Sequence, residues 1–180
     1  MIRHRRRMLL AAAFVLPVTV LVLPFAAHGQ AGCGAPTPED IEGPFYKAGA
    51  PVRASLVEAG SKAETMVLTG AVRSADCKPL ASVSLDFWHA NEQGQYDSAG
   101  YRYRGIVTTD SLGRYRLETN LPPPYAGRPR HIHVKVQRIG GRALTTQLYF
   151  PGESRDAPRA LVLNMERRAE RRIATFDFVL

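Results

Sequence analysis

From Thr65 onward the sequence consists of short segments in which apolar and polar residues alternate, and this pattern restricts the possible folds. Alternation places every second side chain on the same face, which is typical of half-buried strands. Turn-forming sequences such as Asp76-Cys77-Lys78-Pro79 and Gly140-Gly141 separate the segments. The predicted strands are 65–73, 83–89, 106–109, 114–118, 131–138 and 143–150. Many short strands with regular turns predict an all-β domain folded as an antiparallel β-sandwich.

Three further features complete the predicted fold. Asp110-Ser111-Leu112-Gly113 lies between two strands and predicts a hairpin. The apolar spacing after Pro158 predicts a short C-terminal helix over 158–172, followed by a closing strand over 173–180. Residues 30–63 have no sustained period and are interrupted by prolines, so we expect an N-terminal arm there. The β-sandwich domain is then expected over 64–180.

The first 29 residues have the pattern of an export signal. Met1–Arg7 contains four arginines and no acidic residue, residues 8–27 are apolar, and Ala27-His28-Gly29 is a small-x-small cleavage site. Two prolines inside the apolar run argue against a transmembrane anchor. Arg5-Arg6-Arg7 resembles the start of a twin-arginine signal, which serves proteins exported in folded form. We therefore expect a periplasmic or secreted protein that contacts membranes only through its signal or a lipid anchor.

The basic composition does not indicate a nucleic-acid-binding protein. The formal net charge is +8, from 24 basic and 16 acidic residues. Four of the basic residues lie in the export signal, so the remaining chain has 20 basic residues against 16 acidic ones. That chain has no basic stripe with interleaved aromatic residues, which nucleic-acid binding would favour.

The two cysteines, Cys33 and Cys77, both follow the export signal. In an oxidising compartment an even pair favours a disulfide. This bond would tie the arm to the turn that precedes the second strand. The alternative is lipidation of Cys33, because Ala31-Gly32 precedes it as in a lipoprotein site. Gln30 is a poor match to the apolar residue that such sites prefer, so the disulfide is favoured.

His131 and His133 are one residue apart at the start of a predicted strand. They would share one face, with Cα atoms about 7 Å apart, so that both imidazoles could bind one metal ion. A bare His-x-His more often simply lines one face of a strand. No cysteine or acidic residue lies near this pair, whereas Tyr125 precedes it across a Gly-Arg-Pro turn. A phenol, with its pKa near 10, binds only a strongly Lewis-acidic ion, and Fe³⁺ suits two phenolates with two imidazoles.

Several runs of sequence carry a resemblance to a known family. They are Glu42-Gly43-Pro44-Phe45-Tyr46 in the arm, Leu85–Tyr96, Arg104-Gly105 with Thr109-Asp110 and Gly113, Pro122–Tyr125, Arg128–His133 and Thr145–Phe150. In this order and combination they resemble the intradiol ring-cleavage dioxygenases, the family of protocatechuate 3,4-dioxygenase and catechol 1,2-dioxygenase. The similarity spans approximately residues 36–150.

The resemblance implies a ferric site and its residues. The Fe³⁺ ligands would be Tyr96, Tyr125, His131 and His133. Arg128 would stabilise negative charge on the substrate ring, and Gln147 would lie beside the pocket in which oxygen reacts. Tyr125 would also accept a proton from the substrate.

Other residues near these motifs have different expected roles. We expect His89 to be structural, and we place Tyr46, Tyr101 and Tyr103 near the pocket as a hypothesis. Arg130 occupies a position where the family usually has a small residue, so it leaves the size and charge of the substrate open.

The resemblance also implies the reaction. A catechol-type aromatic and O2 would be the substrates, and the ring would open between the two hydroxyl-bearing carbons. Both oxygen atoms would enter a cis,cis-muconate-type product. Which catechol is used stays open, and so does the oligomeric state, a homo-oligomer included.

Two alternatives belong to other functional classes. An exported transthyretin-like β-sandwich that binds carbohydrate or protein would explain residues 65–119 without catalysis. It leaves the ordered Tyr, Tyr, His and His residues unexplained. A copper or zinc protein built on His131 and His133 would need a third nitrogen or sulfur donor.

Overall fold

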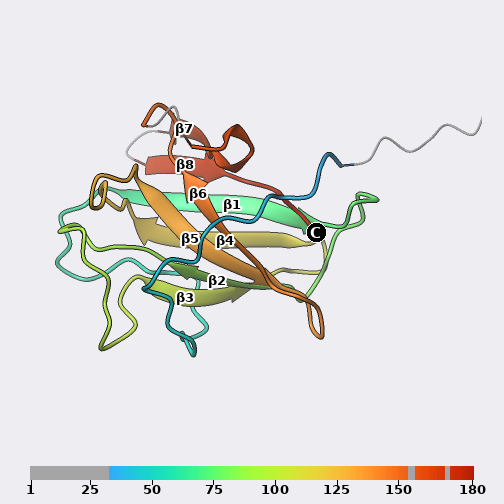
Figure 1. Ribbon diagram of the computed structural model, residues 1–180, viewed down its shortest axis with the longest axis horizontal. Coiled ribbons are helices and arrows are strands. Elements are labelled where there is room, and N and C mark those ends of the chain that lie inside the picture. The colour runs from blue at the N-terminus through green and yellow to red at the C-terminus, as the bar shows by residue number, and fades with distance from the viewer. Residues whose placement is uncertain (1–32, 154–156, 169–170) are drawn as a thin grey trace, which may run out of the picture.

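Two β-sheets pack face to face in the described residues, which are 33–153, 157–168 and 171–180 of a computed structural model (Figure 1). The first sheet, named here the site sheet, has the order β3-β2-β5-β6 with antiparallel neighbours. Its strands are β2 (Ser84–Trp88), β3 (Arg104–Thr108), β5 (His131–Gln137) and β6 (Leu144–Tyr149).

The second sheet, named here the back sheet, has the order β4-β1-β8-β7, and β9 also pairs with β1. Its strands are β1 (Thr65–Arg73), β4 (Arg114–Asn120), β7 (Asn164–Arg168), β8 (Arg171–Thr175) and β9 (Phe178–Val179). β1 is antiparallel to β4 but parallel to β8 and β9. The predicted all-β sandwich is therefore confirmed, with a mixed back sheet instead of a purely antiparallel one.

The core lies between the inner faces of the two sheets. Leu85 and Phe87 of β2 are fully buried there, and so are Ile132 and Val134 of β5. The residues between them point to the outer face of the site sheet because side chains alternate along a strand. Burial of each such core side chain stabilises the fold by about 1.5–3 kcal/mol. The packed core thus fixes which side chains the outer face presents.

The N-terminal arm crosses the outer face of the site sheet from one edge to the other. The crossing begins over β6, where the backbone N–H of Asp40 donates to Thr145 O at 3.0 Å. It reaches the other edge at β3, where the N–H of Arg53 donates to Ile106 O at 3.0 Å. In Figure 1 the arm is the blue segment in front of β5 and β6. The arm therefore covers the side chains that the site sheet turns away from the core.

The predicted C-terminal helix over 158–172 is wrong. This stretch contains the short 3₁₀ helix η1 (Arg159–Leu161), then β7 and the start of β8, which pair antiparallel. Leu161 and Leu163 are buried whereas the intervening Val162 is less so. This two-residue period belongs to an extended chain, and the helical interpretation overlooked it. Residues 169 and 170 of the predicted helix lie outside the described residues.

The hairpin predicted around Asp110-Ser111-Leu112-Gly113 is also wrong. The turn itself forms, because the N–H of Gly113 donates to Asp110 O at 2.9 Å. The strands on either side belong to different sheets, however, since β3 pairs with β2 and β4 pairs with β1. A turn sequence specifies a chain reversal but does not specify the partner of each strand.

Cys33 and Cys77 form a disulfide, with their Cα atoms 4.9 Å apart. The bond holds the start of the arm against the turn after β1. The predicted export signal, residues 1–29, lies outside the described residues. Among the described residues there is no helix with the length and apolar character needed to cross a membrane.

Candidate metal centre

The strand register places the two predicted imidazole ligands on the outer face of the site sheet, beneath the arm. His133 pairs with Trp88 on one side and with Gln147 on the other. One row across the four strands is therefore Arg104, Trp88, His133 and Gln147. The Trp88 ring stacks on the His133 imidazole at 4.8 Å between centroids, with the planes only 7° apart. This stacking fixes the orientation of the His133 ring.

The hydroxyl oxygen of Tyr96 lies between the two imidazoles. It is 3.2 Å from Nε2 of His131 and 3.1 Å from Nε2 of His133. The two imidazole rings are themselves 4.8 Å apart between centroids. Three of the four predicted ligands therefore direct a donor atom at one point, although Tyr96 is far from the two histidines in sequence.

The Tyr96 oxygen and the two Nε2 atoms have too few hydrogens between them for each lone pair to accept a hydrogen bond. Nδ1 of His131 lies 2.7 Å from the carbonyl oxygen of Pro129, and donating to it leaves Nε2 as a lone pair. The Tyr96 hydroxyl has one hydrogen, which it can donate to only one of the two imidazoles. A cation that displaces this hydrogen would accept a lone pair from all three atoms. The donor set therefore fits a hard, strongly Lewis-acidic ion such as Fe³⁺.

Burial controls the protonation of these groups. It lowers the pKa of His131, and together with the positive charge of Arg128 it lowers the pKa of His133 to about 2. Burial raises the pKa of Tyr96 to about 12, against an opposing effect of Arg128. The imidazoles therefore stay neutral at neutral pH, and the phenol keeps its proton unless a cation replaces it.

Tyr125 lies at the start of a tight turn beside Tyr96. The backbones of Tyr125 and Arg128 form two hydrogen bonds, and both Ala126 and Gly127 have positive φ, at 46° and 77°. These values define a turn of type I′, which reverses the chain within two residues. The Tyr125 ring meets the Tyr96 ring edge-on at 5.5 Å between centroids. Among the described residues nothing forms a hydrogen bond to the Tyr125 hydroxyl, so this oxygen is less constrained than that of Tyr96.

Arg128 and Gln147 belong to one hydrogen-bond network. Nη2 of Arg128 donates to Oε1 of Gln147 at 2.8 Å, and Nε2 of Gln147 donates to Ile41 O of the arm at 2.6 Å. The Tyr149 hydroxyl lies 3.3 Å from both Arg128 Nη2 and Gln147 Oε1, and it donates to Asp40 Oδ2 at 2.8 Å. The network holds the Gln147 amide and the Arg128 guanidinium in defined orientations.

Asp40 and Tyr149 belong to this network, although no sequence pattern predicted a role for either of them. Tyr149 could have been found, because it is two residues after Gln147 on a strand and therefore shares its face. Asp40 reaches the network only through the path of the arm, which no local pattern predicts.

The arm forms one wall of the centre. The Phe45 ring stacks on Tyr96 at 4.5 Å with an interplanar angle of 9°, and it meets Tyr125 edge-on at 5.8 Å. Gly43 has a φ of +71°, and a Cβ there would approach Cε1 of His133 to 3.5 Å. The Glu42–Tyr46 motif therefore contacts Tyr96 and Tyr125 and passes close to a third predicted ligand, His133.

The three tyrosines that we placed near the pocket as a hypothesis direct their hydroxyls away from the predicted ligands. Tyr46 donates to Asp86 Oδ2 at 3.1 Å, Tyr101 to Ala48 O at 2.9 Å, and Tyr103 to Glu92 Oε2 at 2.9 Å. These three hydroxyls are therefore engaged away from the four predicted ligands.

His89 and Arg130 also have partners outside the centre. The buried His89 places its two ring nitrogens 2.7 Å from Ala90 O and 2.7 Å from Thr119 Oγ1, as expected of a structural histidine. Nε of Arg130 lies 2.9 Å from Glu153 Oε1. The guanidinium of Arg130 is thus held by an acid outside the ligand set.

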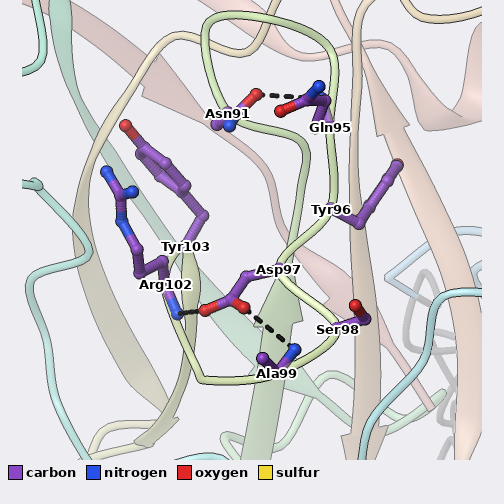
Figure 2. Close-up of a pocket in the computed structure, with 8 residues that line it drawn as sticks. All are labelled: Asn91, Gln95, Tyr96, Asp97, Ser98, Ala99, Arg102 and Tyr103. Carbon is purple, nitrogen blue, oxygen red and sulfur yellow. Dashed lines mark hydrogen bonds between the residues drawn. The ribbon is translucent and has the colours of Figure 1, made fainter.

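A pocket of 260 Å³ lies inside the segment Asn91–Tyr103, named here the Tyr96 loop (Figure 2). Asp97 and Arg102 line it, and Figure 2 shows the Tyr96 side chain directed away from both of them. None of the other three predicted ligands lines this pocket. It is therefore distinct from the point where Tyr96, His131 and His133 converge.

Comparisons with known proteins identify the class. A family model described as dioxygenase matches residues 41–129. The dioxygenase domain of a dioxygenase carbohydrate-binding protein fusion from Streptomyces sp. SirexAA-E is 46% identical, with a TM-score of 0.78 over 81% of this chain and 98% of that one. Catechol 1,2-dioxygenase from Pseudomonas arvilla C-1 has a TM-score of 0.71 at 30% identity, over 81% of this chain and 62% of that one.

The curated relatives agree with these structures. Catechol 1,2-dioxygenase 2 of Acinetobacter lwoffii is 35% identical over 71% of this chain and 56% of its own length. Chlorocatechol 1,2-dioxygenase of Pseudomonas sp. strain P51 is 33% identical over 62% of this chain and 55% of its own length. The chain belongs to the intradiol ring-cleavage dioxygenase family, whose members generally depend on non-haem iron. It spans about half the length of the curated relatives that it matches.

Proposed function

We propose that the protein cleaves a catechol-type aromatic between its two hydroxyl-bearing carbons, using O2 and ferric iron. The product would be a cis,cis-muconate-type diacid that contains both oxygen atoms. The convergence of the Tyr96 oxygen with Nε2 of His131 and of His133, at 3.2 and 3.1 Å, carries this proposal. Family membership supports it, and it does not favour the alternative of a binding module without catalysis.

The four ligands that we assign have complementary tasks. His131 and His133 supply neutral nitrogen donors, and the contact of His131 with Pro129 O orients its ring. Tyr96 and Tyr125 supply phenolates, which balance the charge of a trivalent cation. Bound there, ferric iron would supply Lewis acidity and a template for the two oxygens of a catechol.

Tyr125 is the residue to which we assign proton uptake from the substrate. A catechol arrives as a neutral diol and can bind as a dianion only when two protons leave it, one to the Tyr125 phenolate and the other to a hydroxide ion, which becomes water. The Tyr125 hydroxyl makes no hydrogen bond within the described residues, whereas the Tyr96 oxygen is held between two imidazoles. Proton uptake at Tyr125 Oη avoids the build-up of net charge in a buried site, which would be costly.

Arg128 and Gln147 act on the substrate ring and on its surroundings. Removal of two protons makes the ring electron-rich, and a fixed positive charge nearby stabilises the negative charge that develops during attack by oxygen. The hydrogen bond from Arg128 to Gln147 holds that guanidinium in place before substrate arrives. Gln147 in turn keeps its amide at the border between the arm and β6, next to His133.

We also propose that the protein works outside the cytoplasm. The disulfide between Cys33 and Cys77 supports this, because such bonds persist mainly in oxidising compartments. The pattern of Met1–Arg7 and of the apolar run that follows supports export, and Arg5-Arg6-Arg7 suggests the twin-arginine route.

The reaction can be tested by supplying the protein with a panel of catechols and with isotopically labelled O2. Oxygen uptake should accompany a cis,cis-muconate-type product that carries both labelled atoms. Enzymes that cut outside the two hydroxyls use ferrous iron held by two histidines and a carboxylate, and they form a yellow semialdehyde. A semialdehyde product would contradict the proposed mechanism. A protein without iron that takes up no oxygen with any catechol would favour the binding-module alternative.

A further inference from the structure

Three cationic side chains bind the main chain of the Tyr96 loop and its junction with β3. Lys47 of the arm directs its ammonium at three successive carbonyl oxygens. Its Nζ lies 3.3 Å from Ser98 O, 2.6 Å from Ala99 O and 3.2 Å from Gly100 O. Charge-assisted hydrogen bonds of this kind are stronger than neutral ones. The arm therefore binds the backbone of the loop two to four residues after Tyr96.

Two arginines extend this pattern along the chain. Nη2 of Arg53, also in the arm, donates to Tyr101 O at 2.5 Å, and its Nε donates to Arg104 O at 3.0 Å. Nε of the buried Arg104 donates to Asp97 O at 3.1 Å. Six carbonyl groups of the segment 97–104 thus have cationic donors, and two of the three donor residues belong to the arm.

Three amide groups of the same segment donate to one carboxylate, that of Asp97. The Asp97 carboxylate accepts from the N–H groups of Gly100 at 2.7 Å, Arg102 at 2.9 Å and Ala99 at 3.1 Å. Figure 2 shows two of these bonds inside the loop. They lower the pKa of Asp97, because the carboxylate accepts hydrogen bonds that its neutral form would accept less strongly.

These contacts bear directly on Tyr96, which precedes Asp97 and is in no regular strand. A loop carbonyl is ordinarily hydrated, and a lysine that binds three of them loses the freedom of a long side chain. The contacts bear on metal binding because the position of a metal ligand such as Tyr96 must be fixed within fractions of an ångström. Lys47 also lies 4.5 Å above the centroid of the Tyr101 ring, which restricts it further.

We propose that Lys47 and Arg53 are positioning residues that hold the Tyr96 loop in its metal-binding geometry. They act through the loop backbone and touch neither metal nor substrate. The metal-binding part of this inference rests on the proposed function, whereas the effect on the loop does not. The arm would then serve both as a wall of the centre and as the clamp that sets the Tyr96 oxygen between His131 and His133.

Lys47→Met tests the clamp, because it keeps an unbranched side chain and removes the ammonium. Lys62→Met is the matched control, since Lys62 is exposed and lies in the arm outside these contacts. Hydrogen exchange in the metal-free protein should rise about tenfold or more for amides of 97–104 in Lys47→Met. Exchange in β5 should not change, and Lys62→Met should behave as the parent.

The iron-loaded protein gives the second measurement. Lys47→Met should release iron to a chelator faster than the parent does, and Lys47→Arg should restore much of the retention because it keeps the charge. Arg53→Gln is an independent variant that should also loosen 97–104, and it serves if Lys47→Met does not fold.

Two outcomes would overturn the inference: unchanged exchange in 97–104, or a loosened loop with unchanged iron release. A parent protein that binds no iron would refute the proposed function, while exchange in the metal-free variants would still decide whether the clamp exists.

Discussion

The guanidinium of Arg128 donates a hydrogen bond of 2.8 Å to the side-chain oxygen of Gln147, joining the turn after Tyr125 to strand β6. If this fixed charge stabilises the substrate ring, Arg128→Ala should keep its iron and its colour but lose rate. The expected loss in kcat/KM is about 30- to 1,000-fold, equivalent to about 2–4 kcal/mol, as for one oxyanion-type donor. Steady-state oxygen uptake measures it.

Arg116→Ala is the control for this substitution, because Arg116 is an exposed arginine on β4 of the back sheet and pairs with Glu118. It should leave kcat/KM close to that of the parent. An Arg128→Ala variant that cleaves catechols as fast as the parent would show that the assigned role is wrong.

The second prediction concerns colour. Charge transfer from phenolate to Fe³⁺ should give the purified protein a red-brown absorption band that catechol shifts to longer wavelength. Tyr96→Phe removes the oxygen between the two imidazoles and should lose both the band and the iron. Tyr103→Phe, whose parent hydroxyl binds Glu92, should retain both. Absorption spectra with metal analysis decide the matter, and a colourless parent with stoichiometric zinc or copper would refute the iron assignment.

The third prediction is a dependence of stability on pH that comes from His89. Burial lowers the pKa of His89 from 6.5 to about 4. Between these values the unfolded chain binds a proton that the folded chain does not, so the free energy of unfolding falls as the pH falls. The expected loss is roughly 3 kcal/mol; it is absent above pH 6.5, grows as the pH falls, and is complete near pH 4.

Denaturant unfolding of the metal-free protein at several pH values measures this slope. His131 and His133 contribute with the same sign, so the comparison with His89→Gln isolates the contribution of His89. Glutamine can keep the hydrogen bonds to Ala90 and Thr119 but does not titrate. If His89→Gln retains the full slope between pH 6.5 and 4, the assignment to His89 fails.

The fourth prediction concerns the mature N-terminus. The exported chain should begin near Gln30, with Cys33 and Cys77 joined. Intact mass under non-reducing conditions should show the oxidised pair, and Cys33→Ser with Cys77→Ser should lower stability by about 2–4 kcal/mol because the bond closes a long loop. A diacylglyceryl adduct on Cys33 would instead establish the lipid-anchor alternative.

Much of the fold could be predicted from local patterns. The segment Thr65–Arg73 coincides with β1, and the two strands around Gly140-Gly141 were placed within two residues of β5 and β6. Alternation is a direct consequence of strand geometry, so it survives in the sequence wherever one face is buried.

The errors arise where the structure depends on long-range pairing. The turn at Asp110–Gly113 forms as predicted, yet its flanking strands join different sheets because each finds a partner elsewhere in the chain. β8 likewise becomes a strand by pairing with β1, more than 90 residues earlier in the sequence. Local propensity carries no information about such partners.

Some residues of the candidate site could likewise be predicted from the sequence, whereas others could not. The proximity of His131 and His133 follows from strand spacing alone, and Tyr96 was identified by resemblance. Asp40, Lys47 and Arg53 reach the loop and the network because the arm crosses the whole sheet, and residues 30–63 have no period that would predict this path.

The course of the arm has a consequence for the order in which the protein assembles. Asp40 and Gly43 are synthesised early, but the residues that they contact lie on β5 and β6. These two strands are the last of the site sheet to be synthesised. The arm closes long loops and must dock after those strands exist. We therefore expect the imidazoles to face solvent until the arm binds, so that an ion can reach them from the open side of the sheet.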